Sequence, residues 1–318
     1  GYLNNDSHLD IVVANCWNNN VGVFLGNGDG SFSTQTSYST GLYSLPYSVV
    51  LADVNLDGRL DIVVANSGTD SISILLGYGD GFVNSKNYST GYNSEQYSVA
   101  IGDLNNDNKL DIVVANFDAN NIGILLGYGD GTFSTQTTFL TGSSSSPNSV
   151  ALGDFNNDHY LDIVIALFGY SYIGVVLGLG NGTFSEQVLY STGSRATPSS
   201  VSIGDFNNDD RLDIVAAISF YWTNGIGIFL GDGSGSFAII ELFVTGFGSS
   251  PYWTTIGDFN NDNNLDVVVT NLGTNNIDVF FGLGDGTFLD QETYSTGESS
   301  QPYSVAVGDF NNDTRLDI

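Results

Sequence analysis

Residues 258–266 read Asp-Phe-Asn-Asn-Asp-Asn-Asn-Leu-Asp and are followed directly by three valines. Oxygen-bearing side chains stand at positions 1, 3, 5 and 9 of this stretch, as Asp258, Asn260, Asp262 and Asp266. Calcium takes about six to eight oxygen ligands, and short acidic loops supply them from alternate side chains and a backbone carbonyl at position 7. The stretch therefore predicts a calcium-binding loop that leads into a β-strand.

The same loop recurs through the whole chain, at 2–10, 53–61, 103–111, 154–162, 205–213, 258–266 and 309–317. We call these seven segments the metal loops. The predicted metal ligands outside 258–266 are Asn4, Asp6, Asp10, Asp53, Asn55, Asp57, Asp61, Asp103, Asn105, Asp107, Asp111, Asp154, Asn156, Asp158, Asp162, Asp205, Asn207, Asp209, Asp213, Asp309, Asn311, Asp313 and Asp317. The first loop is incomplete, because Tyr2 occupies position 1. Successive loops begin 51, 50, 51, 51, 53 and 51 residues apart, and such a period indicates propeller blades or solenoid repeats.

Each repeat predicts four short strands, which we call A, B, C and D. In the third repeat, strand A is 97–102, strand B is 112–116 and strand C is 122–126, and strand D starts at 132–133 and ends at 141–142. Strand B is apolar and β-branched, as expected for a strand that is covered on both faces. A glycine-rich turn separates C from D, and a polar segment separates B from C. The pattern favours four-stranded blades over helical calcium motifs, whose last ligand falls at position 12.

Small residues and prolines mark the innermost strand of every repeat. Glycine or alanine precedes the first metal-loop aspartate in each complete copy, as Ala52, Gly102, Gly153, Gly204, Gly257 and Gly308. A small residue suits a strand at a crowded central axis. All five prolines precede or begin strand A, where they remove no donor from the middle of a sheet.

The metal loops and the Gly-Asp-Gly-Thr-Phe turns resemble the FG-GAP/VCBS repeat family, which includes the head of integrin α chains and some fungal lectins. The resemblance covers essentially the whole chain and implies an all-β propeller with Ca²⁺ in each A–B loop. Relatives mostly have seven blades.

The number of blades is a separate prediction. This chain supplies strands B, C and D of a first blade (10–41), five full units and a last strand A (303–308). We predict a single domain over 1–318 with six four-stranded antiparallel blades, closed by the C-terminal strand A joining the N-terminal B, C and D. The alternative is an open arc of a seven-bladed propeller. In the closed form the two terminal metal loops would compete for one place.

The charge of the chain is concentrated in its metal loops. The formal net charge is −29, and 21 of the 30 aspartates lie in the seven loops. Clustered carboxylates repel one another strongly without cations. Four of the six basic residues stand at position 7 of the same loops, so no basic patch predicts a nucleic-acid partner. No apolar run is long enough to insert into a membrane.

Calcium loops of this kind favour an extracellular or cell-surface location, because extracellular modules bind Ca²⁺ at about 10⁻⁴ to 10⁻³ M. A single cysteine, Cys16, allows no disulfide within the chain, and it is expected to be an unreactive structural residue. The chain begins and ends inside the same motif, so we expect it to be part of a longer polypeptide.

The loops at the other end of each blade vary between repeats and carry aromatic residues. We call the B–C and D–A connections the ligand face. Its candidate binding residues are Trp17, Phe117, Phe168, Tyr170, Tyr172, Phe220, Tyr221, Trp222 and Trp253. Exposed aromatics on the loops of a rigid scaffold suit recognition of a protein or a glycan. The other interpretation is that they cap the cores of the blades.

Catalysis has few candidate residues in this chain. Both histidines, His8 and His159, lie in metal loops at non-ligand positions, which disfavours a histidine-based triad. We therefore expect a calcium-stabilised recognition or adhesion module without enzymatic activity of its own. The alternatives are a structural repeat array without a specific ligand and a non-catalytic domain attached to an enzyme.

Overall fold

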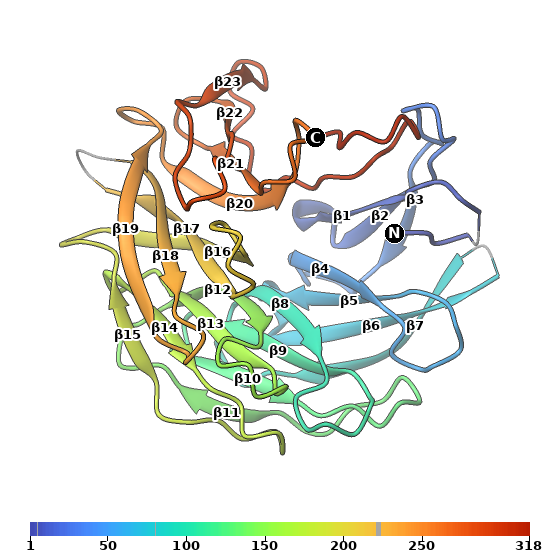
Figure 1. Ribbon diagram of the computed structural model, residues 1–318. Helices are drawn as coiled ribbons and strands as arrows, with labels where there is room; N and C mark the ends of the chain where they lie inside the picture. Colours follow the sequence, from blue (N-terminus) through green and yellow to red (C-terminus); the bar gives the residue numbers. More distant parts are fainter. Residues whose placement is uncertain (5, 80, 221–223) are drawn as a thin grey trace. The chain divides into compact units, whose positions relative to one another are not determined.

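Six antiparallel β-sheets follow one another along the chain (Figure 1). The computed structural model describes residues 1–4, 6–79, 81–220 and 224–318. The predicted fold class, an all-β six-bladed propeller with four-stranded antiparallel blades, is confirmed, although the first sheet has three strands. The only helices among the described residues are the 3-10 turns η1 (Cys16–Asn18) and η2 (Ser67–Thr69).

The chain divides into two compact units, which we describe separately. Unit 1 contains Gly1–Val150, Leu179–Thr183 and Asp309–Thr314, and unit 2 contains Ala151–Gly178, Phe184–Gly308 and Arg315–Ile318. The predicted single domain over 1–318 stays a prediction.

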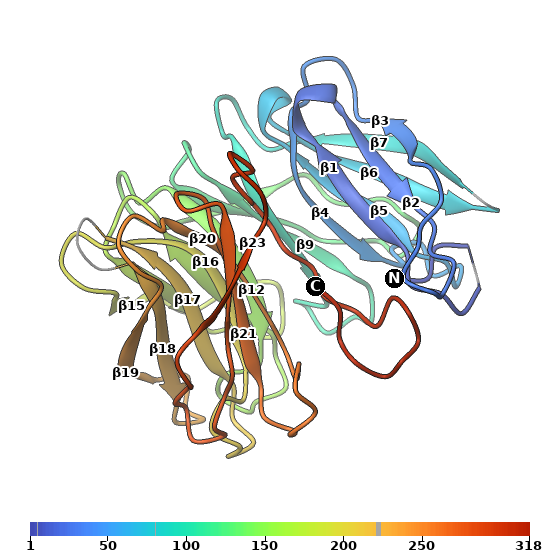
Figure 2. The same ribbon diagram turned by 90° about the horizontal axis from the view of Figure 1, so that it is seen from above.

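Three sheets belong to unit 1. Their strands are β1 (Ile11–Asn15), β2 (Asn20–Phe24) and β3 (Thr36–Ser39); β4 (Pro46–Ala52), β5 (Asp61–Asn66), β6 (Ser71–Tyr78) and β7 (Gly81–Ser89); and β8 (Gln96–Gly102), β9 (Asp111–Asn116), β10 (Asn121–Leu125) and β11 (Thr137–Leu140). Figure 2 shows β4 to β7 side by side in this order.

The fourth, fifth and sixth sheets contain the remaining strands. The first segment of unit 1 ends at Val150, within the first strand of the fourth sheet. The remaining strands are β12 (Pro147–Gly153), β13 (Asp162–Leu167), β14 (Tyr172–Val176) and β15 (Val188–Ser191); β16 (Thr197–Gly204), β17 (Asp213–Ser219), β18 (Gly225–Gly231) and β19 (Phe237–Val244); and β20 (Pro251–Gly257), β21 (Asp266–Asn271), β22 (Asn276–Phe280) and β23 (Glu292–Ser295).

Each of the five internal metal loops is the connection of a β-hairpin. In the third sheet, β8 pairs with β9 from Gly102 opposite Asp111, so that 103–110 forms the loop between them. Strand β9 then pairs with β10 from Asn116 opposite Asn121. This up-and-down order places the metal loop and the C–D turn at one end of each sheet and the B–C and D–A connections at the other.

The hydrophobic cores lie between neighbouring sheets. In unit 1, Val63, Ile72 and Ile74 of the second sheet pack with Ile112 and Val114 of the third, and all five are fully buried. In unit 2, strands of the fifth and sixth sheets pack in the same way through a second cluster. Both faces of each full strand B are therefore covered, which explains why β5, β9, β13 and β21 contain no exposed residue.

The glycines that precede the metal loops receive a side chain from the next repeat. A Cβ atom on Gly153 would lie 2.7 Å from the Leu212 side chain, and one on Gly204 would lie 2.5 Å from Leu265. The leucine at position 8 of the following metal loop therefore fills the space that a larger residue would need. This packing supports the prediction of a small residue at that place.

Strand D is shorter than predicted in the third sheet. Segment 132–141 forms a regular strand only at β11, preceded by an isolated bridge between Gly127 and Phe133. The reason is a serine side chain: the Leu126 N–H donates to Ser134 Oγ at 2.9 Å, so a hydroxyl interrupts the backbone ladder.

The predicted fourth strand of the first sheet is not formed by 303–308. This segment has no strand pairing except one bridge between Gly308 and Asp317, and the first sheet consists of β1, β2 and β3. In the complete repeats strand A pairs with the strand B that follows its own metal loop. Among the described residues, 303–307 have no such strand partner.

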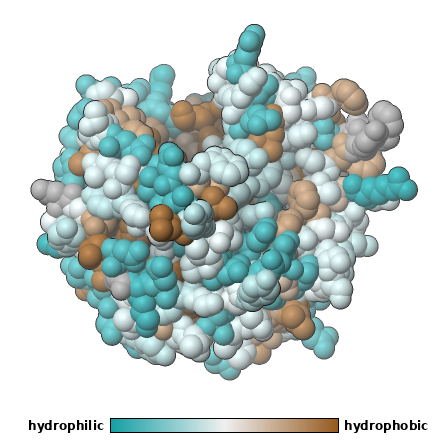
Figure 3. Space-filling view, turned by 180° about the vertical axis from the view of Figure 1, so that it is seen from behind, coloured by the Kyte–Doolittle hydropathy of each residue, from teal (hydrophilic) through white to brown (hydrophobic). Residues whose placement is uncertain are grey.

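The surface shown in Figure 3 is mostly hydrophilic or intermediate, and apolar residues gather there in small groups. Scattered apolar residues are normal on a protein surface. No helix among the described residues is long and apolar enough to cross a membrane.

Candidate functional site

Six metal loops share one hydrogen-bonded geometry. In loop 53–61, Asp53 Oδ1 accepts from the Asp57 N–H at 3.1 Å, and Asp53 Oδ2 accepts from the Gly58 N–H at 2.7 Å. Asn55 Oδ1 accepts a second bond from the Asp57 N–H at 3.0 Å. The loops that begin at Asp103, Asp154, Asp205, Asp258 and Asp309 repeat these contacts.

Positions 4 and 6 of these loops have a left-handed backbone. Leu56 and Gly58 have φ angles of 59° and 82°, and Asn106 and Asn108 have φ angles of 62° and 60°. Glycine, asparagine and aspartate tolerate this conformation best. The asparagine and glycine residues between the predicted ligands are thus explained by backbone shape, a role that the sequence analysis did not assign.

Position 9 has a different role from positions 1, 3 and 5. Asp111 is fully buried. One carboxylate oxygen accepts from the Leu104 N–H at 2.9 Å, and the other accepts from the Gly127 N–H at 2.7 Å. The carboxylate therefore ties the metal loop to the C–D turn of the same sheet. Asp10, Asp61, Asp162, Asp213 and Asp266 make the equivalent pair of contacts.

Burial raises the pKa of five position-9 carboxyl groups, those of Asp61, Asp111, Asp162, Asp213 and Asp266. The pKa of Asp162 and that of Asp213 are each raised to about 6, chiefly by burial and further by the neighbouring aspartates at positions 1 and 5. Backbone N–H donors oppose this shift without cancelling it. A cation beside such a cluster would favour the charged form of each carboxylate.

The donor chemistry of each complete loop fits a hard cation. Positions 1, 3 and 5 present two carboxylates and one amide oxygen on the same turn, and a backbone carbonyl stands at position 7. Among the described residues, no group of three or more carboxylate, imidazole or thiol side chains gathers closely enough to hold a metal. The candidate ligand set thus mixes carboxylate and amide oxygens, which suits Ca²⁺ rather than zinc.

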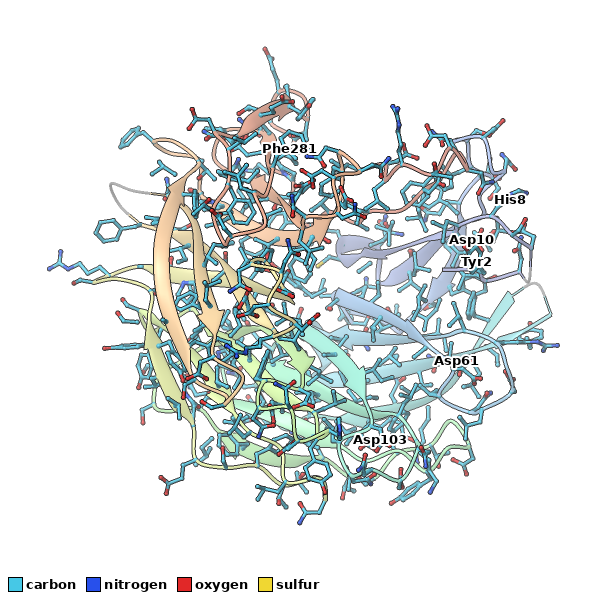
Figure 4. All side chains as sticks on the ribbon, viewed as in Figure 1. Tyr2, His8, Asp10, Asp61, Asp103 and Phe281 are labelled. Atoms are coloured by element: carbon cyan, nitrogen blue, oxygen red, sulfur yellow. The ribbon has the colours of Figure 1, made fainter. Side chains whose placement is uncertain are left out.

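The two terminal metal loops lie beside each other, and loop 2–10 differs from the other six at position 1. In loop 2–10, Tyr2 is 53% exposed and leaves position 1 without a carboxylate; Figure 4 labels Tyr2, His8 and Asp10 in this loop. Loop 309–317 keeps the contacts of Asp309 to the Asp313 and Thr314 N–H groups. The Asn312 amide lies 3.3 Å from His8 Nδ1, so the loops lie beside each other in unit 1. The expected competition for one place applied to a first sheet closed by strand 303–308, which is not formed, so that expectation stays untested.

Five of the C–D turns also contact a second metal loop. The Gly131 N–H donates to the Val54 carbonyl at 3.1 Å, and the Gly235 N–H donates to the Phe155 carbonyl at 3.0 Å. Phe155 in turn packs edge-on against Phe237, with ring centroids 5.3 Å apart. The metal loops are therefore joined to the neighbouring sheet as well as to their own.

On the ligand face, the predicted aromatics divide into two groups. Trp17 is 87% exposed and Tyr172 is 39% exposed, as recognition requires. Phe117, Phe168, Tyr170, Phe220 and Trp253 are half-buried. Phe117, for example, packs against Tyr97 with ring centroids 4.6 Å apart, which is a capping role. Tyr221 and Trp222 lie outside the described residues.

Four further highly exposed apolar residues of the ligand face were not predicted from the sequence. They are Leu42, Tyr43, Tyr92 and Phe247, with exposed fractions of 84, 79, 98 and 78%. All four lie in D–A connections, within two residues after the Thr-Gly pair that follows strand D. That repeated Thr-Gly pair, followed by a residue that changes between repeats, is the signal that could have found them.

Unit 2 contains a cleft on its ligand face, with a volume of about 740 Å³. Its lining residues come from three places: Arg195 and Thr197 at the start of β16; Ser219, Phe220 and Asn224 at the end of β17 and before β18; and 247–250 before β20. The side chains that line it include Arg195, Thr197, Ser219, Phe220, Asn224 and Phe247. We call it the Arg195 cleft.

Comparison with known families identifies the repeats. The family model of the FG-GAP-like repeat matches at 3–64, 53–114, 103–165, 157–216, 211–269 and 258–318, which together span the chain. The comparison with curated proteins finds no sequence match.

Solved structures with a similar fold have different activities. Virginiamycin B lyase from Staphylococcus aureus shares 15% identity at a TM-score of 0.65, over 95% of this chain and 86% of the lyase. A lectin from Agrocybe aegerita that recognises non-reducing terminal N-acetylglucosamine shares 19% identity at a TM-score of 0.60, over 97% and 84%. The periplasmic gluconolactonase of Pseudomonas aeruginosa shares 14% identity at a TM-score of 0.67, over 87% and 78%.

These likenesses correct one expectation from the sequence. The prediction that the chain has no enzymatic activity is wrong, because a lyase and a gluconolactonase use the same fold. At identities below 20% the likeness shows the fold alone. Fold does not decide function, which depends on sites placed on it.

Proposed function

The chain belongs to the FG-GAP-like repeat family, and on that premise we propose that it is a calcium-stabilised extracellular recognition module. Its ligand would be a protein or a glycan bound at the ligand face. The observation that carries the binding role is the exposure of apolar side chains at the loop tips of one blade end, including Trp17 and Tyr92. Large apolar side chains at almost full exposure stabilise no core, whereas they suit recognition.

Calcium would act through the metal loops. Ligands at positions 1, 3 and 5 would be held by the backbone contacts that already shape the turn in loops such as 103–111. The bound cation would offset repulsion among carboxylates and stabilise the folded state, since a ligand that binds only that state stabilises it by mass action. An extracellular location follows from this role, because weak loops fill where Ca²⁺ is abundant.

Other features support a glycan as one class of ligand. The lectin from Agrocybe aegerita, which recognises a terminal sugar, has a similar fold over most of its length. Aromatic side chains such as Trp17 and Tyr92 offer flat faces with a polar edge, which suit sugars as well as proteins. Adhesion through such contacts is the cellular role that we propose.

A glycan array, with a pull-down from extracellular protein extracts, tests the proposal in millimolar Ca²⁺. We expect a ligand whose binding falls at least about ten-fold in Trp17→Ala, Tyr92→Ala or Phe247→Ala, because aromatic residues carry most of the energy at binding sites. The matched controls are Tyr78→Ala and Tyr128→Ala, which remove tyrosines that are 58% and 56% exposed at the metal-loop end of their sheets.

Two outcomes would contradict the recognition role. One is a folded protein that retains no ligand in either experiment, which would favour a structural repeat array. The other is a ligand that the two control variants lose and the three ligand-face variants keep. That result would place binding at the metal-loop end.

A further inference from the structure

We propose that the Arg195 cleft binds the carboxylate of an acidic sugar residue, such as a terminal hexuronate. The inference rests on the proposed recognition function and names the ligand class of one site within it. Three observations support it: the shape of the cleft, its isolated positive charge, and loop residues that differ from those at the same positions of the other repeats.

The floor of the cleft is formed by loops that are already fixed to one another. Asn224 Oδ1 accepts from the Phe220 N–H at 2.9 Å, and Asn224 Nδ2 donates to the Gly246 carbonyl at 3.4 Å. Thr197 Oγ1 donates to the Ser219 carbonyl at 3.1 Å. These bonds join all three connections, so the site is largely formed before a ligand arrives, as small-ligand sites usually are.

Arg195 is the one charged residue among the described residues that line the cleft, and no aspartate or glutamate is among them. None of the ion pairs found within the described ranges includes Arg195. Four of the other five basic residues stand in metal loops, and Lys86 lies over the Tyr88 ring at 4.7 Å. An uncompensated guanidinium in a chain of net charge −29 is complementary to an anionic group. Its planar donors match a carboxylate with two parallel hydrogen bonds.

The backbone at Arg195 is unusual for this residue type. Its φ angle is 64°, in the left-handed region that costs a non-glycine residue about 1 kcal/mol or more. The equivalent residues in the other five D–A connections are Tyr43, Asn93, Ser144, Gly248 and Ser299, and all share this left-handed conformation. The backbone shape therefore belongs to the repeat, and the feature particular to this connection is that the position carries a guanidinium.

The same loops also depart from the repeat elsewhere. Ala196 replaces the serine that bonds to the Thr-Gly threonine in the other five D–A connections, and Thr192 Oγ1 is buried without a partner as a result. The fifth metal loop and the sixth begin 53 residues apart, two or more beyond the other spacings. Breaks in local rules concentrate at functional sites.

The cleft suits a sugar better than an acidic peptide. Phe247 is 78% exposed and Phe220 is half-buried, so an aromatic face is available for stacking beside the guanidinium. The Ser250 side chain is exposed at the same rim and can bond to sugar hydroxyls. A concave volume of about 740 Å³ falls in the usual range for small-molecule sites of about 300–1,000 Å³, whereas protein partners need wider and flatter contacts.

Calorimetric titration of the whole 318-residue chain in millimolar Ca²⁺ tests this proposal. The probes are a glucuronate-terminated tetrasaccharide, its neutral glucose-terminated counterpart and an aspartate-rich octapeptide. We expect the acidic saccharide to bind at least about ten-fold more tightly than the neutral one, and Arg195→Gln to remove that difference, because a charge-assisted pair is lost. Lys86→Gln changes the net charge equally and is expected to have no effect. Circular dichroism melting confirms that both variants fold.

Three results would overturn the proposal: equal affinity for the two saccharides, an unchanged affinity in Arg195→Gln, and tighter binding of the octapeptide than of the acidic saccharide. If a neutral glycan binds and Phe247→Ala abolishes that binding, the recognition function survives while the acidic-sugar inference fails. Absence of any ligand in the wider screens would instead count against the recognition function itself.

Discussion

Asp111 lies 16 residues before Gly127 in the chain, and its carboxylate accepts a 2.7 Å hydrogen bond from the Gly127 N–H. The same carboxylate holds the Leu104 N–H at the start of the metal loop. A Cβ atom on Gly127 would collide with the Leu110 carbonyl, which is why glycine is needed there. This contact explains how the metal loop and the C–D turn remain together at one end of the sheet.

The first prediction concerns the two roles of aspartate within one metal loop. With calcium chelated, Asp111→Ala is expected to lower the free energy of unfolding by about 2–3 kcal/mol, because two buried N–H groups lose their acceptor. Asp107→Ala changes an exposed side chain and is expected to cost within about 0.5 kcal/mol under the same conditions. Urea unfolding of both variants in EDTA measures the difference. Equal losses in the two variants would contradict the structural role of position 9.

The second prediction concerns the threonine–serine pair that closes the D–A connections. Ala196→Ser supplies the missing partner of Thr192 and is expected to raise the free energy of unfolding by about 0.5–1.5 kcal/mol. Ser145→Ala removes the 2.7 Å bond to Thr141 and is expected to lower it by a similar amount. Thermal melts measure both variants. We expect the melting temperature to rise in Ala196→Ser and to fall in Ser145→Ala, so each variant serves as a control for the other. A lower melting temperature for Ala196→Ser would show that the loop before β16 requires the alanine.

The third prediction is a pH dependence that originates in the sixth sheet. Asp278 is buried on β22, where it accepts hydrogen bonds from Thr293 and Asn271. Burial is the largest cause of the raised pKa of this carboxyl group. The folded state therefore holds the proton more tightly than the unfolded state, and stability is lost as pH rises through the folded pKa. Asp278→Asn does not lose stability in this way, because asparagine has no carboxyl group to titrate.

We therefore expect the stability of Asp278→Asn relative to the native chain to increase as pH rises from 4 and to level off above the folded pKa. Urea unfolding in chelator across this pH range measures the difference directly. Because the other carboxyl groups are present in both proteins, their titration cancels. A relative stability that is flat or falls with pH would show that Asp278 is not stabilised in its neutral form.

Much of the fold could be predicted from the sequence because each repeat encodes it locally. The apolar run 112–116 became β9 within one residue, and Pro147 and Pro251 begin β12 and β20. The closure at the termini could not be predicted in this way. Pairing of 303–308 depends on which strand is available as a partner, and a repeat pattern does not contain that information.

The candidate site was only partly visible in the sequence. Composition at alternating positions identified Asp103, Asn105 and Asp107 as one oxygen cluster, but it could not show that Asp111 turns inward to bond Gly127. Side-chain exposure likewise depends on packing: Phe117 stacks on Tyr97, whereas Tyr92 is almost fully exposed. Ligand identity remains a proposal for the same reason, since recognition residues follow no repeat.

The measurement that tests the central claim most directly is thermal unfolding in EDTA, in millimolar CaCl₂ and in millimolar MgCl₂. Each filled site is expected to contribute about 1–2 kcal/mol at ten-fold excess over its Kd, so several loops together predict a large rise in Tm that calcium produces and magnesium does not. Single losses such as Asp107→Ala should remove only a fraction of that rise. An identical Tm in all three solutions would contradict the account. The metal loops would then be turns held by their own hydrogen bonds, and the extracellular assignment would lose its main support.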